Sequence, residues 1–420
     1  MTRSGFDVRP ARPVLVTAAL FVLVVFAASG VAYLFRWALH RIVERYADYA
    51  DPTRAASSLD SITLFVVAAG SVALAATIGH VVHRHWESRT GIEAVAASAR
   101  GEDRNISFRA TWLRVAATWI VSAGLVSIGR ESAIVESGGS LGSVVGRRSG
   151  GRGVALAAAG IAAAFSAAYH APVAAVLYAE EHLRVRQSSR ATVFVLFGAA
   201  GGFAFTVWLF GGGDPILPDV DGSMWSVVGG GLIVVVPVVV VSRVFLQLRV
   251  RVTADALARA IGCRPWIVVA SLSVLAGLSV VAFPLASGNG MDALERGPEA
   301  ATLTLALAMM VGKLVGTTAA LGAGAPGGVL SPTLAVAAGC ALLVADRWEA
   351  MVAAMAVGVA VGMRSPLVAV FLVPELLGTY WLVLPIAVVV GIAFVLDRGI
   401  DKLVVRYGRV IPTGVYDEDA

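Results

Sequence analysis

The stretch that decides the fold is SIGRESAIVESGGSLGS, residues 127–143, which carries Arg130, Glu131 and Glu136 among small residues. It follows the apolar run ATWLRVAATWIVSAGLV at 110–126. Ionisable side chains inside a membrane are costly, and they commonly mark an ion pathway. The stretch therefore predicts a break between two helices, with a candidate site at the break.

The composition predicts an all-α polytopic membrane protein, placed in the cell membrane. Of the 420 residues, 58% are hydrophobic and 15% are charged, whereas soluble domains carry about 25% charged residues. Runs of about 20 apolar residues fit the hydrocarbon core of a bilayer, and their lack of alternation argues against a β-barrel. The runs lie at 13–35, 61–79, 111–128, 192–210, 226–248, 266–286, 301–322 and 378–396.

The net charge of +5 does not indicate a nucleic-acid partner, because the arginines cluster beside apolar runs as the positive-inside rule predicts. The basic loop 80–109 is predicted to be cytoplasmic. Two isolated cysteines, Cys263 and Cys340, form neither a disulfide framework nor a metal site. The sequence also lacks a G-x-x-x-x-G-K-[ST] motif. We expect no cofactor and no metal, with the lipid bilayer as the surrounding partner.

Several helical segments, among them 131–146 and 366–376, are too short or too interrupted to span a bilayer, and two of the breaks correspond. GRESAIVESGG at 129–139 and GAPGGVLSPTL at 324–334 each follow a long apolar run and each open a Gly-rich helix. Interrupted segments at corresponding positions point to the binding site of a transporter. They predict an N-terminal arm and first membrane helix at 1–59, a first half at 60–187, a helix and linker at 188–224, a second half at 225–408 and a tail at 409–420.

Helix starts at such breaks favour a negative ion. Free N–H groups and the helix dipole each stabilise an anion by roughly 0.3–1 kcal/mol, and glycine lets the backbone approach it closely. Four starts are candidates for convergence: Thr90-Gly91-Ile92, Arg130-Glu131, Gly328-Val329-Leu330 and Ile400-Asp401. The residues thus predict an anion pathway built from backbone amides.

The chain resembles the CLC family of chloride channels and proton-coupled chloride antiporters. GRESA at 129–133 is similar to the family's GREGP, and GAPGGVLSP at 324–332 to its GxPGGxFxP. HAPVAAVLYAEE at 170–181 and RTGIEA at 89–94 resemble two further family motifs in the same order. The resemblance implies tilted, broken helices in two inverted-topology halves. It also implies a homodimer with one pathway per subunit.

The resemblance assigns roles to particular residues. Glu131 matches the family's gating glutamate, whose carboxylate competes with the anion and moves away when it is protonated. Arg130 is expected to support the site electrostatically. The anion-binding residues implied are Thr90, Gly91, Ile92, Arg130, Val329 and Leu330.

Three departures from the family motifs affect this transfer. Thr90 stands in place of the coordinating serine, and Glu93 replaces a proline. Asp401 aligns with the inner-gate tyrosine; it is either an inner gate or a helix cap that faces water, and a shifted alignment would bring Tyr407 nearby. The acid pair Glu180-Glu181 arrives one residue early relative to the family motif.

Counted from Pro172, Glu181 takes the place of the family's first acid and His182 that of the second, which in antiporters is the inner proton site. Histidine titrates near neutral pH and can relay protons. The alternative is that residues 180–182 form a solvated helix end. Glu136 is either a second proton stop or a buried group with local hydrogen bonds.

Together, these features predict transport of chloride or a similar small anion in exchange for protons, gated by Glu131. The alternatives are a passive anion channel of the same fold and a fluoride/proton antiporter. An enzyme is not expected, because no nucleophile–base pair or metal cluster supports one.

Overall fold

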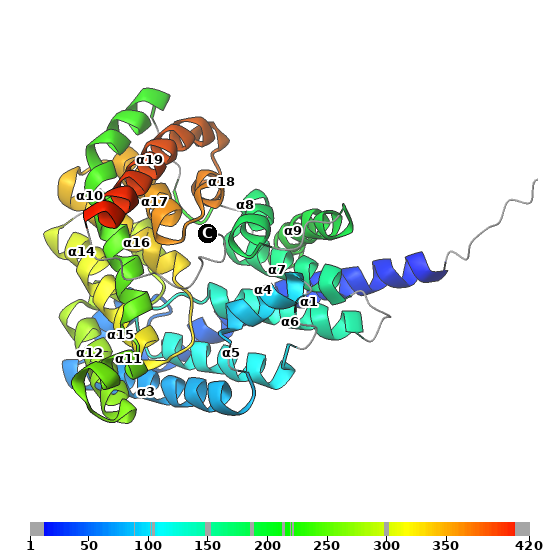
Figure 1. Ribbon diagram of the computed structural model, residues 1–420, viewed down its shortest axis with the longest axis horizontal. Helices are drawn as coiled ribbons and strands as arrows, with labels where there is room; N and C mark the ends of the chain where they lie inside the picture. The colour runs from blue at the N-terminus through cyan, green and yellow to red at the C-terminus, as the bar shows by residue number, and fades with distance from the viewer. Residues whose placement is uncertain are drawn as a thin grey trace, which may run out of the picture.

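The computed structural model describes residues 12–87, 89–100, 102, 106–147, 153–184, 189–211, 215–218, 220, 222–297 and 302–407. The predicted tail at 409–420 and the start of the N-terminal arm lie outside this part of the chain. The described chain folds into helices, and its β-structure is one isolated bridge between Gly129 and Gly328 (Figure 1). The prediction of an all-α fold is confirmed for the described residues.

Helices of the first part of the chain include both long and short elements. They are α1 (Arg12–Ala47), α2 (Pro52–Ser58), α3 (Ser61–His85), α4 (Gly91–Arg100), α5 (Phe108–Ala123), α6 (Glu131–Arg147), α7 (Gly153–Tyr169), α8 (Pro172–Leu177), the π-helix η1 (Tyr178–His182) and α9 (Ser189–Phe210). The pair α6 and α7 packs together, and α7 packs on α9 and α1.

Helices of the second part repeat this mixture. They are α10 (Met224–Arg251), α11 (Ala254–Ile261), α12 (Pro265–Ala282), η2 (Pro284–Ala286), α13 (Met291–Glu295), α14 (Leu303–Leu307), η4 (Ala308–Gly312), α15 (Lys313–Ala323), α16 (Leu330–Val344), α17 (Trp348–Gly362), α18 (Pro366–Leu376), η5 (Tyr380–Leu382) and α19 (Val383–Tyr407). Figure 1 shows α4 to α9 on one side of the molecule and α10 to α19 on the other, with α3 beside α12.

Seven helical segments of the described chain are long and apolar enough to cross a membrane. They coincide with seven of the eight predicted runs. The run at 111–128 differs, because α5 has 16 residues and ends where Gly124 caps it and Leu125 takes a positive φ of 61°. A left-handed residue at this point stops the helix before it reaches spanning length.

The short helices are buried between the long ones. Proline occupies the first turn of both α8 and α18, where its missing N–H is tolerated. The helices α6 and α7 approach so closely that a Cβ on Gly138 would overlap the Gly160 carbonyl, and the reverse holds as well. Small residues at contacts of this kind allow tight helix packing in membranes.

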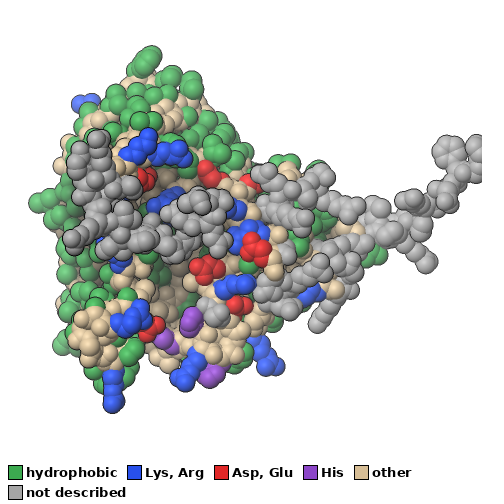
Figure 2. Space-filling view, in the orientation of Figure 1, with side chains coloured by type: hydrophobic (Ala, Val, Ile, Leu, Met, Phe, Trp, Pro, Cys, Tyr) green, Lys and Arg blue, Asp and Glu red, His purple; other side chains and the backbone are tan. Residues whose placement is uncertain are grey.

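The exterior is apolar where the long helices face outward. Exposed side chains include Ile62, Trp208, Trp266 and Val395, each more than 60% exposed. Figure 2 shows hydrophobic side chains along the left and upper edges of the face in view, with charged and histidine side chains nearer its middle. Apolar patches of this extent mark a surface that contacts lipid or protein rather than water.

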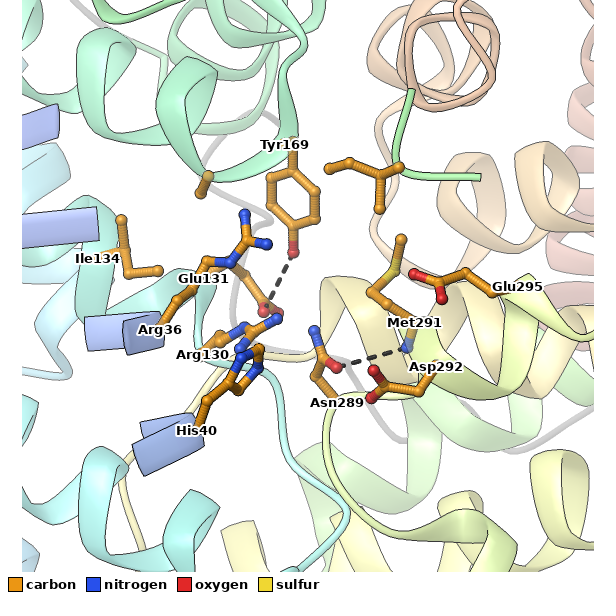
Figure 3. A pocket seen from close by; sticks show the side chains of 12 residues that line it. Arg36, His40, Arg130, Glu131, Ile134, Tyr169, Asn289, Met291, Asp292 and Glu295 are labelled. Carbon is orange, nitrogen blue, oxygen red and sulfur yellow. Dashed lines mark hydrogen bonds between the residues drawn. The ribbon is translucent and has the colours of Figure 1, made fainter. Parts of the chain in front are cut away.

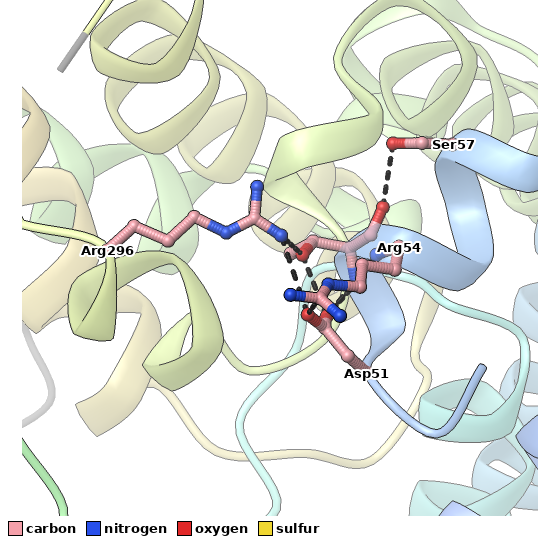
Figure 4. Close-up of polar contacts among 5 residues, drawn as sticks. Asp51, Arg54, Ser57 and Arg296 are labelled. Atoms are coloured by element: carbon pink, nitrogen blue, oxygen red, sulfur yellow. Dashed lines mark hydrogen bonds and ion pairs between the residues drawn. The ribbon is translucent and has the colours of Figure 1, made fainter. Parts of the chain in front are cut away.

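A polar cluster ties the first helices to the second part of the chain. The Asp51 carboxylate caps α2 by accepting hydrogen bonds from the Thr53 and Arg54 backbone N–H groups at 2.7 and 3.3 Å. Arg296, just after α13, donates to Asp51 and to the Thr53 hydroxyl (Figure 4). The cap therefore fixes the end of α1 relative to the segment around α13.

Candidate functional site

The two predicted breaks meet in space. Gly129 donates from its N–H to the Gly328 carbonyl at 2.9 Å, and Gly328 donates back to Gly129 at 2.6 Å. This two-bond bridge places the start of α6 beside the start of α16. Both positions need glycine, since a Cβ on either residue would overlap the Glu131 carboxylate.

The Glu131 side chain crosses from α6 to the first turn of α16. Its Oε1 accepts a hydrogen bond from the Leu330 N–H at 2.6 Å. Its Oε2 accepts from the hydroxyls of Tyr169 and Ser331, each at 3.3 Å. The residue is only 4% exposed. A carboxylate therefore occupies the helix start at which an anion would be most strongly stabilised.

One side of Glu131 opens into a cavity of about 140 Å³, named here the Glu131 cavity. Figure 3 shows Arg36, His40 and Arg130 on one wall and Asp292 and Glu295 opposite them. Burial, reinforced by repulsion from Asp292, raises the pKa of Glu295. Basic and acidic groups thus surround the approach to Glu131 on this side.

A second cavity, of about 430 Å³, lies on the other side of the start of α6 and is named here the Glu136 cavity. Ser132, the residue directly after Glu131, lines it together with Thr90, Gly91, Arg114 and Glu136. Adjacent residues of α6 therefore face different cavities. The start of α6 thus contributes Glu131 to the first cavity and Ser132 to the second.

The predicted anion-binding residues at 90–92 lie in and beside the Glu136 cavity. Thr90 and Glu93 form a reciprocal cap on α4: the Thr90 N–H donates to Glu93 Oε2 at 2.9 Å, and the Glu93 N–H donates to the Thr90 hydroxyl at 3.4 Å. The glutamate that replaces the family's proline thus stabilises the helix start. Ile92 packs against the core.

Glu181 lies at a helix start rather than in either cavity. Its two carboxylate oxygens accept from the Leu367 and Val368 N–H groups at 3.0 and 2.8 Å, which caps α18. Glu375, at the end of α18, caps α8 in the same way through Val173 and Ala174. The continuous segment of α8 and η1 and the helix α18 therefore cap each other, as expected for corresponding elements of two repeats.

His182 ends the π-helix η1 and contacts the same helix start. Its Nδ1 lies 2.9 Å from the Ser365 hydroxyl, and its ring stacks on Tyr178 with centroids 4.9 Å apart. The two predicted proton-coupling residues of the pair thus differ in their contacts: the acid holds a helix start, and the histidine contacts the side chains of Ser365 and Tyr178.

The expectation of a fourth helix start at Ile400-Asp401 is wrong. Both residues lie within α19, which runs without interruption from Val383 to Tyr407. Asp401 pairs with Arg243 on α10, which also pairs with Asp397. The helix continues because Gly399 alone does not break it. Asp401 is consequently an ion-pair partner between α10 and α19, and it is not at the start of a helix.

Three residues of the site went unassigned in the sequence. Tyr169 and Ser331 bind the Glu131 carboxylate and also lie 2.8 Å from each other through their hydroxyls. The third is Arg114, which lines the Glu136 cavity. As a single arginine within an apolar run, it was the clearest sign in the sequence of a further site residue. Among the described residues, no group of three His, Cys, Asp or Glu side chains is placed to hold a metal ion.

A family model for the voltage gated chloride channel matches residues 72–398. The chain belongs to this chloride channel family. Its relatives include the H(+)/Cl(-) exchange transporters ClcA of Salmonella agona and Salmonella typhi, each 29% identical over 298 residues. These alignments cover 64% of this chain and 61% of each relative, so the chain matches less than two thirds of their length.

Solved structures of chloride channel family proteins share the fold. A slow cyanobacterial Cl-/H+ antiporter gives a TM-score of 0.73 at 19% identity, covering 95% of this chain and 98% of that one. A CLC-type fluoride/proton antiporter gives 0.69 at 16% identity, with the same coverage. The predicted CLC-type fold is confirmed, and the chain is an integral membrane protein.

Proposed function

We propose that this protein exchanges chloride or a similar small anion for protons across the membrane, with Glu131 as the gate. The observation that carries the proposal is the Glu131 carboxylate, which is bound to the Leu330 amide at the first turn of α16. It lies between two cavities that approach it from opposite sides of the start of α6. Relatives of the chain that are named H(+)/Cl(-) exchange transporters support the same conclusion.

The proposed exchange follows from competition for one helix start. The ionised carboxylate accepts hydrogen bonds from Leu330, Tyr169 and Ser331, so it excludes an anion from these donors. Protonation removes the negative charge and weakens these bonds, because charge-assisted hydrogen bonds are about twice as strong as neutral ones. The neutral side chain then leaves, and an anion takes the Leu330 amide. Proton and anion occupancy are coupled in this way.

The remaining predicted ligands receive roles within this path. Val329 and Leu330 supply the start of α16, and Arg130 adds positive charge at the wall of the Glu131 cavity. Gly91 and the Thr90 hydroxyl border the Glu136 cavity. We assign Glu181 to helix capping, and His182 to proton relay on the side away from Glu131.

The decisive test is Glu131→Gln in purified protein reconstituted into liposomes. The variant should carry chloride without moving protons, since glutamine cannot exchange a proton. External pH and chloride are recorded together, and the matched control is Glu102→Gln, which removes an exposed carboxylate paired with Arg100. Proton movement that persists in Glu131→Gln contradicts the gating role.

The same liposomes separate the exchanger from a passive channel. For an exchanger, an outward chloride gradient drives protons uphill, whereas a channel of the same fold moves the anion alone. Replacing chloride with fluoride tests the fluoride/proton alternative, which the fold shared with a fluoride/proton antiporter keeps open. Uphill proton movement with fluoride but not chloride would assign the protein to that alternative.

A further inference from the structure

The Glu136 cavity contains a buried ion pair that the proposed gating by Glu131 does not use. Arg114 on α5 is 6% exposed and Glu136 on α6 is 2% exposed. Arg114 Nε and Nη2 donate to Glu136 Oε1 at 2.8 and 2.6 Å. Burying two charges is costly even when they are paired, so their place on a cavity wall calls for a physical reason.

The Arg114 guanidinium has an N–H group that the ion pair does not use. A guanidinium and a carboxylate commonly pair through two parallel bonds that use both oxygens. Here both bonds converge on one oxygen, and Arg114 Nη1 is buried without a hydrogen-bond partner among the described residues. A buried donor that lacks an acceptor is uncommon in native proteins and points to an ion or water that completes the site.

The carboxylate of this pair lies against a helix start. A Cβ on Gly91, the first residue of α4, would overlap the Glu136 carboxylate. The first N–H groups of α4 and the charge of Arg114 therefore both favour negative charge at this place. Glu136 supplies that charge in the structure, much as Glu131 does at the start of α16.

The surrounding cavity is large enough for a small hydrated anion. Its volume is about 430 Å³, and a water molecule takes up roughly 30 Å³ of liquid. His80, His83 and Arg89 line it beside Arg114, and the other acids on its wall are Glu87 and Asp255. Basic groups thus border the route to the buried guanidinium.

We infer that the Arg114 guanidinium is a second binding site for the transported anion and that the Glu136 carboxylate competes with the anion for it. The inference rests on the proposed transport function and extends it to the second cavity. The helix α6 then carries two competing acids, Glu131 at the Glu131 cavity and Glu136 at the Glu136 cavity. A small monovalent anion fits both places.

Isothermal titration of the detergent-solubilised protein with chloride, and separately with fluoride, tests this competition. Glu136→Gln should tighten anion binding about tenfold, the scale of one charge-assisted hydrogen bond. The double variant Arg114→Gln/Glu136→Gln should lose this gain, because it lacks the guanidinium. The control is Asp255→Asn, which removes an exposed carboxylate from the same cavity and should change the affinity little.

The outcomes separate this inference from the proposed function. An unchanged affinity in Glu136→Gln, with Glu131→Gln still altering binding, overturns the second site and leaves the gate intact. Absence of chloride and fluoride binding in both the native protein and Glu131→Gln overturns the proposed function itself. If Glu136→Gln does not fold, bromide-soaked crystals of the native protein decide: anomalous density beside Arg114 supports the site, and its absence there overturns it.

Discussion

Among single residues, the hydrogen bonds of Glu181 and His182 decide which of the two can carry protons. Glu181 is held by two backbone N–H groups, whereas His182 contacts the Ser365 hydroxyl through one ring nitrogen. An imidazole that binds a hydroxyl, and not the N–H groups of a helix start, can gain and lose a proton without releasing that start. This difference favours His182 over Glu181 as the proton relay.

We predict that His182→Ala lowers proton flux by about tenfold or more while anion flux persists, because the variant lacks an imidazole that can accept and release a proton. Burial, with the nearby charge of Arg249, lowers the pKa of His182 to about 4, so the ring is neutral at rest and holds the proton only in transit. Simultaneous records of pH and chloride in liposomes measure both fluxes. His85→Ala is the matched control, since His85 is an exposed histidine at the end of α3. Equal loss of both fluxes in His182→Ala would instead indicate a structural role for the ring.

At the scale of helices, the reciprocal caps between α8 and α18 hold the two short elements together. Glu375 of α18 accepts from the first N–H groups of α8, and Glu181 of η1, which continues α8, accepts from those of α18. At the N-cap position of neither helix does a local side chain accept a hydrogen bond from these N–H groups. The caps could not be predicted from the sequence, because each joins residues far apart in the chain with no local pattern.

Loss of either cap should destabilise the protein by similar amounts. Glu181→Ala and Glu375→Ala each remove the acceptor of two N–H groups, at a cost of about 1–3 kcal/mol for an N–H group that is buried and less where water can reach it, as at the exposed residue Leu367. Apparent melting temperatures in detergent, read from the surviving monodisperse fraction, provide the comparison. Exposed Glu102→Ala should leave the melting temperature near the native value. A melting curve of Glu181→Ala equal to the native one would show that the cap contributes no stability.

Much of the arrangement of helices could be predicted, because proline and glycine at the breaks are local signals. The segments predicted at 131–146 and 366–376 match α6 and α18 to within a residue. The helix start predicted at Ile400-Asp401 is wrong, since α19 runs through both residues without interruption. Tyr169 was missed because its contact with Glu131 depends on how α7 packs, which no single segment encodes.

At the scale of the whole molecule, we predict a homodimer, as the resemblance to the family implies. Exposed apolar side chains lie near both short helices: Val173 on α8, Leu367 on α18 and Leu384 on α19. Light scattering with detergent correction should give the mass of two 43.3 kDa chains. Leu384→Arg should lower the measured mass toward that of one chain. Val395→Arg is the comparison variant, since Val395 is also exposed and lies on the same helix. A single-chain mass for the native protein would contradict the assembly.

The Gly129–Gly328 bridge has a consequence for how the chain tolerates change. Its two bonds run between main-chain atoms, which every amino acid except proline retains in full. Other side chains around the gate can therefore change during evolution, as GRESA in place of GREGP illustrates, while the starts of α6 and α16 stay hydrogen-bonded to each other. The alignment of the pathway therefore depends on the main chain, and mutational scans will detect it only at Gly129 and Gly328, where any side chain meets the Glu131 carboxylate.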